Sequence, residues 1–260
     1  MENVIYLKNN FKIKKISFTR LVTYFIVYSF FGYIAETFFG LFSKGVIESR
    51  QSFLFGPLCA IYGIGAILMI LFLDPYKEKT WTVFWGSIVI GTISEYMMSY
   101  ICEVLFNFKW WDYSDYLLNI NGRTCLFFAL LWGISGLGVV KYFNPLLDKN
   151  LSKCGKIMNH TSRKVITTFT VILLILDVFV TIVALKMFFK KVSKDYDINT
   201  NVSKSYSTLE VTANNYIDED FILKVYPNMR VAGTNYNNIF IDNLYRGVKT
   251  YSYKFLNTNT

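Results

Sequence analysis

The chain has 260 residues, of which 53% are hydrophobic and 18% aromatic, while only 17% are charged. A soluble domain has about 25% charged residues, so this composition argues against an ordinary soluble protein. The net charge of +9 would suit a nucleic-acid-binding protein, but the basic residues cluster beside long apolar runs, where they orient spans and contact anionic lipid headgroups. We therefore expect a membrane protein whose partner is the lipid bilayer and not a nucleic acid.

Five apolar runs predict an all-α protein, a polytopic transmembrane helical bundle of about five spans. We expect these spans at residues 21–42, 57–73, 81–106, 124–143 and 165–189. The longer runs have about the 20 residues that a helix needs to cross a hydrocarbon core of ~30 Å. The run 57–73 is short for a crossing, so a broken or re-entrant helix is an alternative there.

Three regions follow from this pattern: a basic juxtamembrane segment at 1–20, the transmembrane bundle at 21–189 and a small polar C-terminal tail at 190–260. We expect the first segment to be helical from Phe11 onward. The tail is rich in Asn, Tyr, Ser and Thr and has no run long enough to span. Its two short apolar segments suit strands or a small docked unit, and they lie at 221–225 and 239–244.

Small residues and prolines mark particular places in the spans. Pro57 should open the second span, because the missing N–H of proline is not needed in a first helical turn. Ser87 and Gly91 are spaced four apart, which lets another helix approach closely. Asn144-Pro145 should end the fourth span.

The distribution of charge predicts an orientation. Thirteen lysines and arginines lie in residues 1–20, 74–80 and 141–164, and only four lie in the intervening loops at 43–56 and 107–123. Basic loops favour the cytoplasmic side, so the N-terminus is expected inside. Five crossings would place the tail outside, whereas the lysines directly after the last span favour the inside, so the side of the tail is left open.

The sequence predicts no metal site and no cofactor. The four cysteines lack CxxC spacing, and His160 is the only histidine, so a zinc site or a Ser-His-Asp triad has little support. Cys59, Cys102 and Cys125 lie in or beside apolar runs and are expected to be packing residues.

Eight short elements follow one another between residues 25 and 145. They are Gly32-x-x-x-Glu36-Thr37, Arg50-x-x-Phe53-Leu54-x-Gly56-Pro57, Ile61-Tyr62-Gly63, Glu95-Tyr96, Glu103-x-x-Phe106, Trp111-Asp112-Tyr113-Ser114-Asp115, Asn119-x-Asn121-Gly122-Arg123-x-Cys125-Leu126 and Trp132-Gly133. In this order and spacing they resemble the Putative ABC-transporter type IV family of bacterial integral membrane proteins. Tyr226-Pro227-Asn228-Met229 extends the resemblance slightly into the tail.

The resemblance implies a multi-pass protein of the bacterial cell membrane with a permease role. The chain has no GxxxxGK[ST] phosphate loop, so any ATPase that drives transport would be a separate subunit.

Carboxylates within the spans and arginines in the adjoining loops are the candidate site. A charged residue at a helix centre costs about 2.5–3.5 kcal/mol on insertion scales, and such residues usually face a cavity or a partner. One interpretation is a polar pocket in the outer half of the bundle that binds a ligand or carries protons. The alternative is a set of Glu–Arg pairs that hold helices and loops together. The candidates are Glu36, Arg50, Glu95, Glu103, Asp112, Asp115 and Arg123.

The loop at 107–123 permits a further alternative. Asp112 and Asp115 could act as acid and base in carbohydrate hydrolysis, with Trp110 and Trp111 stacking on sugar faces. Trp at a helix end is also typical of an interfacial anchor, which is the interpretation that we favour for both tryptophans.

Three functions therefore stay open. The leading hypothesis is an integral membrane permease or transport component. The alternatives are an integral membrane enzyme that acts on an envelope lipid or glycan, and a non-catalytic membrane scaffold. The sequence leans away from an enzyme and does not determine the substrate or the oligomeric state.

Overall fold

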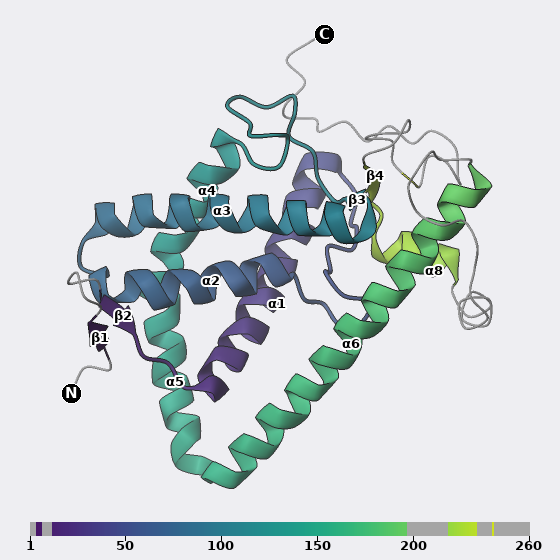
Figure 1. The fold of residues 1–260 in the computed structure, drawn as a ribbon. Coiled ribbons are helices and arrows are strands. Elements are labelled where there is room, and N and C mark those ends of the chain that lie inside the picture. Colours follow the sequence, from purple (N-terminus) through teal and green to yellow (C-terminus); the bar gives the residue numbers. More distant parts are fainter. Residues whose placement is uncertain (1–3, 7–11, 197–217, 233–240, 242–260) are drawn as a thin grey trace. The chain divides into compact units, whose positions relative to one another are not determined.

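The computed structural model describes residues 4–6, 12–196, 218–232 and 241 (Figure 1). Helices dominate this part of the chain, which confirms the predicted all-α class. Their bounds are α1 (Phe18–Lys44), α2 (Ala60–Leu73), the 3-10 turn η1 (Asp74–Tyr76), α3 (Thr80–Phe106), α4 (Leu126–Gly138), the π-helical turn η2 (Val139–Phe143), α5 (Asn144–Ile157), α6 (His160–Asp195) and α8 (Glu219–Val225). Two short antiparallel strand pairs complete the described elements: β1 (Val4–Tyr6) with β2 (Lys12–Lys14), and β3 (Phe108–Lys109) with β4 (Arg230–Val231).

Within the described residues, four helical stretches are long and apolar enough to cross a membrane. They are Phe18–Lys44, Thr80–Phe106, Leu126–Lys153 and His160–Asp195. The shortest has 27 residues and is about 40 Å long at ~1.5 Å per residue, more than the ~30 Å of a hydrocarbon core. α2 has 14 residues and is about 21 Å long, as expected for the short second run. The chain is thus a multi-pass membrane protein.

The N-terminal segment differs from the prediction. Residues Lys12–Lys14 form strand β2, which pairs with β1 from Val4↔Lys14 to Tyr6↔Lys12. The expected helix from Phe11 onward is therefore wrong, and α1 begins only at Phe18. Alternation of Lys12, Ile13 and Lys14 fits a strand, in which successive side chains point to opposite faces.

The second apolar run becomes helical later than expected, because α2 begins at Ala60 and not at Pro57. Gly56 has a φ of +81°, in the left-handed region where glycine carries no Cβ penalty. The Leu54 N–H donates to Thr181 Oγ1 at 2.9 Å, and the Phe55 N–H donates to Asp177 Oδ1 at 3.2 Å. These distant α6 side chains satisfy the loop backbone and hold it outside the helix.

The fourth span does not end at Asn144-Pro145, which corrects that prediction. The helix runs from α4 through η2 into α5, so Pro145 lies inside a continuous stretch. The Asn144 N–H donates to the Val139 carbonyl, five residues back. This wider turn accommodates a proline that would otherwise clash with the preceding turn of an α-helix.

Two compact units divide the chain, each assembled from three segments. Unit 1 comprises Met1–Gly32, Ala60–Met97 and Tyr113–Leu174, and unit 2 comprises Tyr33–Cys59, Met98–Asp112 and Ile175–Thr260. α1, α3 and α6 each contribute one part to either unit. The division expected from sequence (1–20, 21–189 and 190–260) follows the membrane boundaries instead and stays a prediction.

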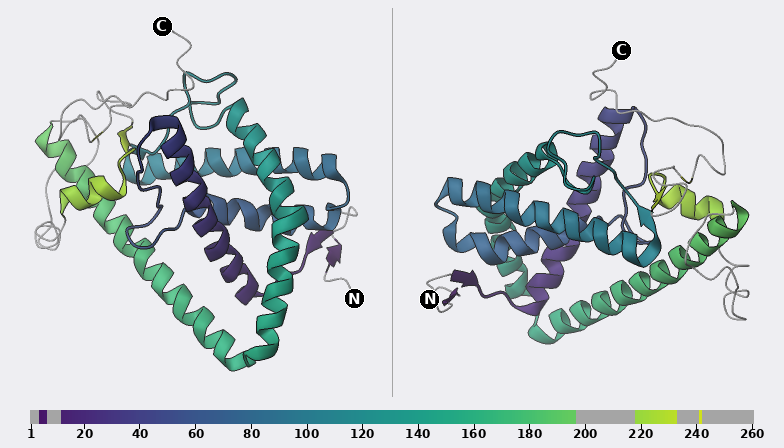
Figure 2. Two further views of the ribbon diagram at one scale, coloured as in Figure 1. Left: turned by 180° about the vertical axis from the view of Figure 1, so that it is seen from behind. Right: turned by 45° about the horizontal axis from the view of Figure 1, so that its top comes forward.

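In unit 1, α4 crosses α3 (Figure 2), and small residues let these helices pack closely. A Cβ atom on Gly91 of α3 would overlap the Trp132 side chain of α4, and one on Gly136 would overlap Ser87. The Trp132 ring also packs at a tilt against that of Tyr62 of α2, with 5.2 Å between ring centroids. The close helix approach predicted at Ser87 and Gly91 is therefore confirmed.

A charged cluster centred on Asp148 also belongs to unit 1. Lys14 Nζ lies 3.1 Å from the Asp148 carboxylate and 3.2 Å from that of Asp74. Arg20 lies 3.4 Å from Asp148, to which the Tyr24 hydroxyl also donates. The N-terminal segment, the turn after α2 and α5 thus meet in unit 1, while the predicted orientation in the membrane stays a prediction.

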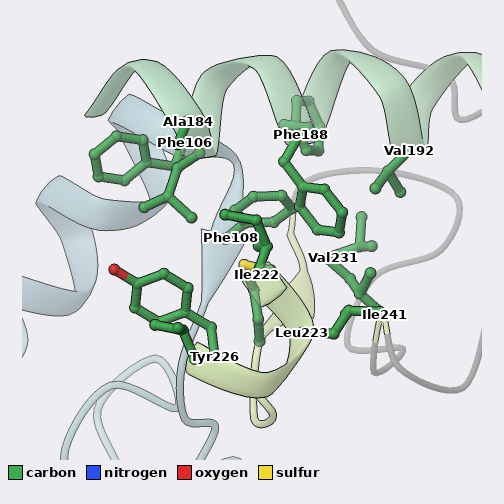
Figure 3. Packing of buried hydrophobic residues seen from close by; sticks show 14 of the residues in the cluster. Phe106, Phe108, Ala184, Phe188, Val192, Ile222, Leu223, Tyr226, Val231 and Ile241 are labelled. Carbon is green, nitrogen blue, oxygen red and sulfur yellow. The ribbon is translucent and has the colours of Figure 1, made fainter. Parts of the chain in front are cut away.

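Unit 2 has an aromatic and aliphatic core, which Figure 3 shows beneath α6. Phe188 and Phe108 are side by side in this core, with 6.3 Å between ring centroids. Ile222 and Tyr226, from α8 and the residue after it, are 2% exposed and pack into the same cluster. The apolar segment 221–225 is thus a helix docked on the unit, and not a strand. Apart from Ile241, the segment 239–244 lies outside the described residues.

Candidate functional site

Glu95 is the most enclosed of the predicted site residues, with only 5% of the residue exposed. Thr124 Oγ1 donates to one carboxylate oxygen at 2.9 Å, and the Tyr113 hydroxyl donates to the other at 3.3 Å. The Tyr113 ring stacks on Phe128, with 4.5 Å between centroids. A buried carboxylate needs such donors, because an unsatisfied polar group in an apolar environment is costly.

Arg123 lies next to this carboxylate network in unit 1. Its guanidinium carbon is 5.6 Å from the centre of the Tyr96 ring, a distance typical of a cation–π contact. Asn121 donates to the Tyr96 hydroxyl at 2.9 Å. The loop that follows Tyr113 is therefore attached to α3 at both Glu95 and Tyr96. Asp115, in the same loop, is exposed.

A second polar network lies in unit 2 at the end of α1. The Lys44 side chain is only 2% exposed, and its Nζ atom lies 3.2 Å from Glu48 Oε2. Lys44 also donates to Asn228 Oδ1, and the Asn228 amide donates to Glu48 at 3.2 Å. Lysine, glutamate and asparagine thus form a closed triangle of hydrogen bonds, which we call the Lys44 network.

Arg50 extends the Lys44 network toward the middle of α1. Its guanidinium lies 3.5 Å from Glu48 Oε2, and both side chains are 12% exposed. A Cβ atom on Gly40 would lie 2.8 Å from the Arg50 guanidinium, so the absence of a side chain at Gly40 admits the arginine. Glu36, Gly40 and Lys44 are four residues apart and share one helix face, which is the polar seam of α1. Glu36 is half-buried there.

The remaining predicted residues of unit 2 lie near β3. Glu103 is 3.9 Å from Lys109 Nζ, and the two side chains are 24% and 12% exposed. The Trp110 ring packs edge-on against Phe106 and Tyr226, with centroids 6.1 Å apart in both cases. Asp112 and Trp111 are half-buried. The role of both tryptophans as interface anchors stays a prediction.

The structure therefore distributes the predicted site over two units. Unit 1 contains Glu95, Asp115 and Arg123, and unit 2 contains Glu36, Arg50, Glu103, Asp112, Trp110 and Trp111. The single pocket expected from the sequence stays a prediction, as does the hydrolytic pairing of Asp112 with Asp115, because each of these combines residues of both units.

Several residues of these networks were missed from the sequence, among them Lys44, Glu48, Tyr113, Thr124 and Asn228. Lys44 lies eight residues after Glu36, and the helical period of α1 would have placed it on the same face. Asn228 belongs to the Tyr226-Pro227-Asn228-Met229 motif, which was a usable signal. Thr124 carried no signal, since a neutral hydroxyl at a helix start is common.

The described residues contain no group of three or more His, Cys, Asp or Glu that could hold a metal ion. Cys59, Cys102 and Cys125 are free thiols. Burial raises the pKa of the Cys125 thiol, and a thiol that stays protonated is a poor nucleophile.

The fold and these networks define a polytopic helical membrane protein with charged side chains enclosed among its helices. The sequence profile described as Putative ABC-transporter type IV matches residues 23–182. The chain belongs to this family. Comparison with curated proteins and with solved structures gave no match.

Proposed function

We propose that the chain is the membrane-embedded subunit of a bacterial transport system and that a separate ATPase subunit drives it. Membership of a family described as an ABC transporter supports this function, as do the four helices in the described part of the chain that are long and apolar enough to span a membrane. The 260 residues contain no phosphate-binding loop, so nucleotide hydrolysis is assigned to the partner.

The observation that carries the proposal is the Lys44 network at the end of a membrane-spanning helix. Two cations, Lys44 and Arg50, share the Glu48 carboxylate at 3.2 and 3.5 Å. Charged groups in membrane helices are expensive and commonly mark a substrate or ion pathway. Arg50 offers a planar fork of donors, which suits a carboxylate or phosphate group.

The arrangement gives the site a simple way to bind and release a polar or charged ligand. An acidic group of the ligand takes the place of Glu48 beside Arg50 and Lys44, and Glu48 returns when the ligand leaves. Asn228, which contacts both Lys44 and Glu48, holds the network together during the exchange. Glu36, on the same helix face, extends the polar seam along the path.

The proposal is tested by comparing the solute content of cells that lack the native gene and produce either the wild-type chain or Arg50→Gln. We expect a polar or charged solute to accumulate or disappear with the wild type and not with the variant, at equal protein levels. Asp148→Asn is the matched control, because it perturbs an ion cluster of unit 1 without touching the Lys44 network. If no solute distinguishes wild type from Arg50→Gln, the transport function is wrong.

A non-catalytic scaffold is the second candidate, and one observation favours it. Glu48 Oε2 already accepts from Lys44, Arg50 and Asn228, so these groups can satisfy one another without a ligand. In that case Arg50→Gln lowers the melting temperature as Asp148→Asn does, and neither variant changes the solute content of the cell.

A further inference from the structure

Three large aliphatic side chains lie exposed in one turn of the loop that leads to α4. Leu117 is 75% exposed, Leu118 69% and Ile120 52%. Single exposed aliphatic residues are ordinary, but a group of this kind at one place marks an interaction surface. We call these three residues the apolar turn.

Leu118 has a backbone conformation that leucine rarely adopts. Its φ is +51°, in the left-handed region that glycine and sometimes asparagine adopt and that disfavours a side chain such as leucine. Asn121 and Gly122 of the same loop also have positive φ, at 53° and 66°, and these residue types tolerate it. The loop therefore keeps a leucine where asparagine or glycine would fit the backbone better, and that leucine is exposed.

Local hydrogen bonds hold the apolar turn in shape. Asn119 Nδ2 donates to the carbonyl groups of Ser114 and Tyr116 at 2.9 and 3.0 Å, and Asn119 Oδ1 accepts from the Gly122 N–H at 3.1 Å. The Ile120 N–H donates to the Thr124 carbonyl at 2.9 Å. A turn that is fixed by so many bonds presents its aliphatic side chains outward in a defined arrangement.

The position of the turn indicates what covers it. The Leu126 N–H donates to the Leu117 carbonyl at 3.3 Å, and Leu126 is the first residue of the membrane-spanning stretch Leu126–Lys153. Leu126, Phe127 and Leu130 at the start of that stretch are themselves 38–45% exposed. The apolar turn thus continues the apolar surface of a membrane helix beyond its end.

We propose that Leu117, Leu118 and Ile120 insert into the lipid bilayer beside the start of α4 and anchor the loop there. Aliphatic side chains on a polar backbone turn suit the boundary between headgroups and acyl chains, where apolar groups are buried and the backbone stays hydrated. The anchor is independent of the transport function, because none of its residues belongs to the Lys44 network.

The test places an environment-sensitive fluorophore on the turn of the full-length chain. Cys59, Cys102, Cys125 and Cys154 are replaced by serine, Leu118→Cys is introduced and labelled, and the protein is reconstituted in phosphatidylcholine–phosphatidylglycerol nanodiscs that contain nitroxide-labelled lipid. We expect blue-shifted emission and strong quenching. Asp115→Cys, at an exposed position of the same loop, is the control and should remain red-shifted and weakly quenched. Equal quenching at both positions would overturn the proposal.

A second variant separates lipid from a protein partner. Leu118→Asn suits the left-handed backbone and removes the apolar side chain, so it should retain the melting temperature of the wild type in detergent. In nanodiscs it should reduce the quenching of a label placed by Ile120→Cys. If blue-shifted emission instead requires a high protein-to-lipid ratio, the turn contacts a second copy and the lipid proposal is wrong.

Hydrogen exchange of the unmodified chain tests the proposal if the variant without cysteines fails to fold. Insertion predicts slower exchange of the backbone amides of residues 116–121 in nanodiscs than in detergent, and equal exchange in both would overturn the proposal.

Discussion

The hydroxyl group of Thr124 donates a 2.9 Å hydrogen bond to the buried carboxylate of Glu95. Thr124 lies two residues before the start of α4, whereas Glu95 lies within α3. Tyr113, at the other end of the same loop, donates a second bond to Glu95. One carboxylate therefore fastens both ends of the loop to a membrane helix, which gives Glu95 a positioning role.

Thr124→Val tests this role, because valine keeps the shape of threonine and removes the hydroxyl donor. Glu95 is then left with one hydroxyl donor fewer in a buried environment. We expect a loss of about 1–3 kcal/mol in stability. The melting temperature in detergent, measured by tryptophan fluorescence, should fall accordingly.

Thr23→Val is the matched control for that substitution. Among the residues that the structure describes, the Thr23 hydroxyl donates to a carbonyl of its own helix, that of Thr19 at 2.9 Å. Its loss removes no donor from a buried charge. Its melting temperature should stay close to that of the wild type. Equal losses for both variants would mean that the bond to Glu95 contributes nothing specific.

Gly91→Ala tests the packing of α3 against α4. A Cβ atom at this position would overlap the rigid Trp132 indole, so the two helices must move apart. Overpacking of this kind costs about 1–3 kcal/mol, which a thermal unfolding measurement in detergent will detect.

Gly138→Ala is the control, since the nearest atom to its new Cβ, at 3.2 Å, belongs to the exposed Phe143 ring. That ring can move aside, and alanine is a better helix former than glycine by about 1 kcal/mol. We therefore expect Gly138→Ala to be neutral or stabilising. A destabilised Gly138→Ala with an unaffected Gly91→Ala would contradict the packing described for unit 1.

Much of the fold could be predicted from the sequence, because charge is excluded from membrane helices and the apolar runs are therefore visible. Some boundaries could not. The late start of α2 depends on Thr181 and Asp177, more than 120 residues away along the chain, and the continuation through Pro145 depends on a π-helical turn.

The candidate site shows the same limit. Glu95 and Arg50 stand out because a charge near a membrane is expensive. Thr124, which donates to Glu95, and Lys44 and Asn228, which share Glu48 with Arg50, do not stand out, since they are neutral or lie at the end of a span. Only the folded chain brings Lys44 and Asn228 together across 184 positions of sequence.

Asp148→Asn tests the charged cluster that joins the N-terminal segment to α5. Asp148 lies 3.1 Å from Lys14 and 3.4 Å from Arg20, and its side chain is 21% exposed. Asparagine keeps the shape but removes the charge that faces both cations. We expect a loss of about 1–3 kcal/mol, which should shrink at high salt because these groups are partly exposed and therefore screened.

Glu78→Gln is the control for charge removal, because Glu78 is exposed in the turn before α3. Such surface charges contribute little to stability, about 0–1 kcal/mol. Thermal unfolding at low and high salt should therefore show a salt-dependent effect for Asp148→Asn and almost none for Glu78→Gln. A salt-independent loss at Asp148 would indicate a steric and not an electrostatic role.

Ile222→Ala and Phe221→Ala form a pair of neighbouring substitutions on α8 with opposite burial. Ile222 is 2% exposed within the core of unit 2, whereas Phe221 is 41% exposed. Truncation of a buried isoleucine costs about 2–5 kcal/mol, because it removes apolar contacts and leaves a cavity. The larger phenylalanine should cost less, since much of its side chain is already exposed to the surroundings and its ring lies 6.5 Å from that of Phe55 between centroids. Thermal unfolding of both variants measures how firmly α8 is docked. If Ile222→Ala is no more destabilising than Phe221→Ala, α8 does not contribute to the core that contains Phe108 and Phe188.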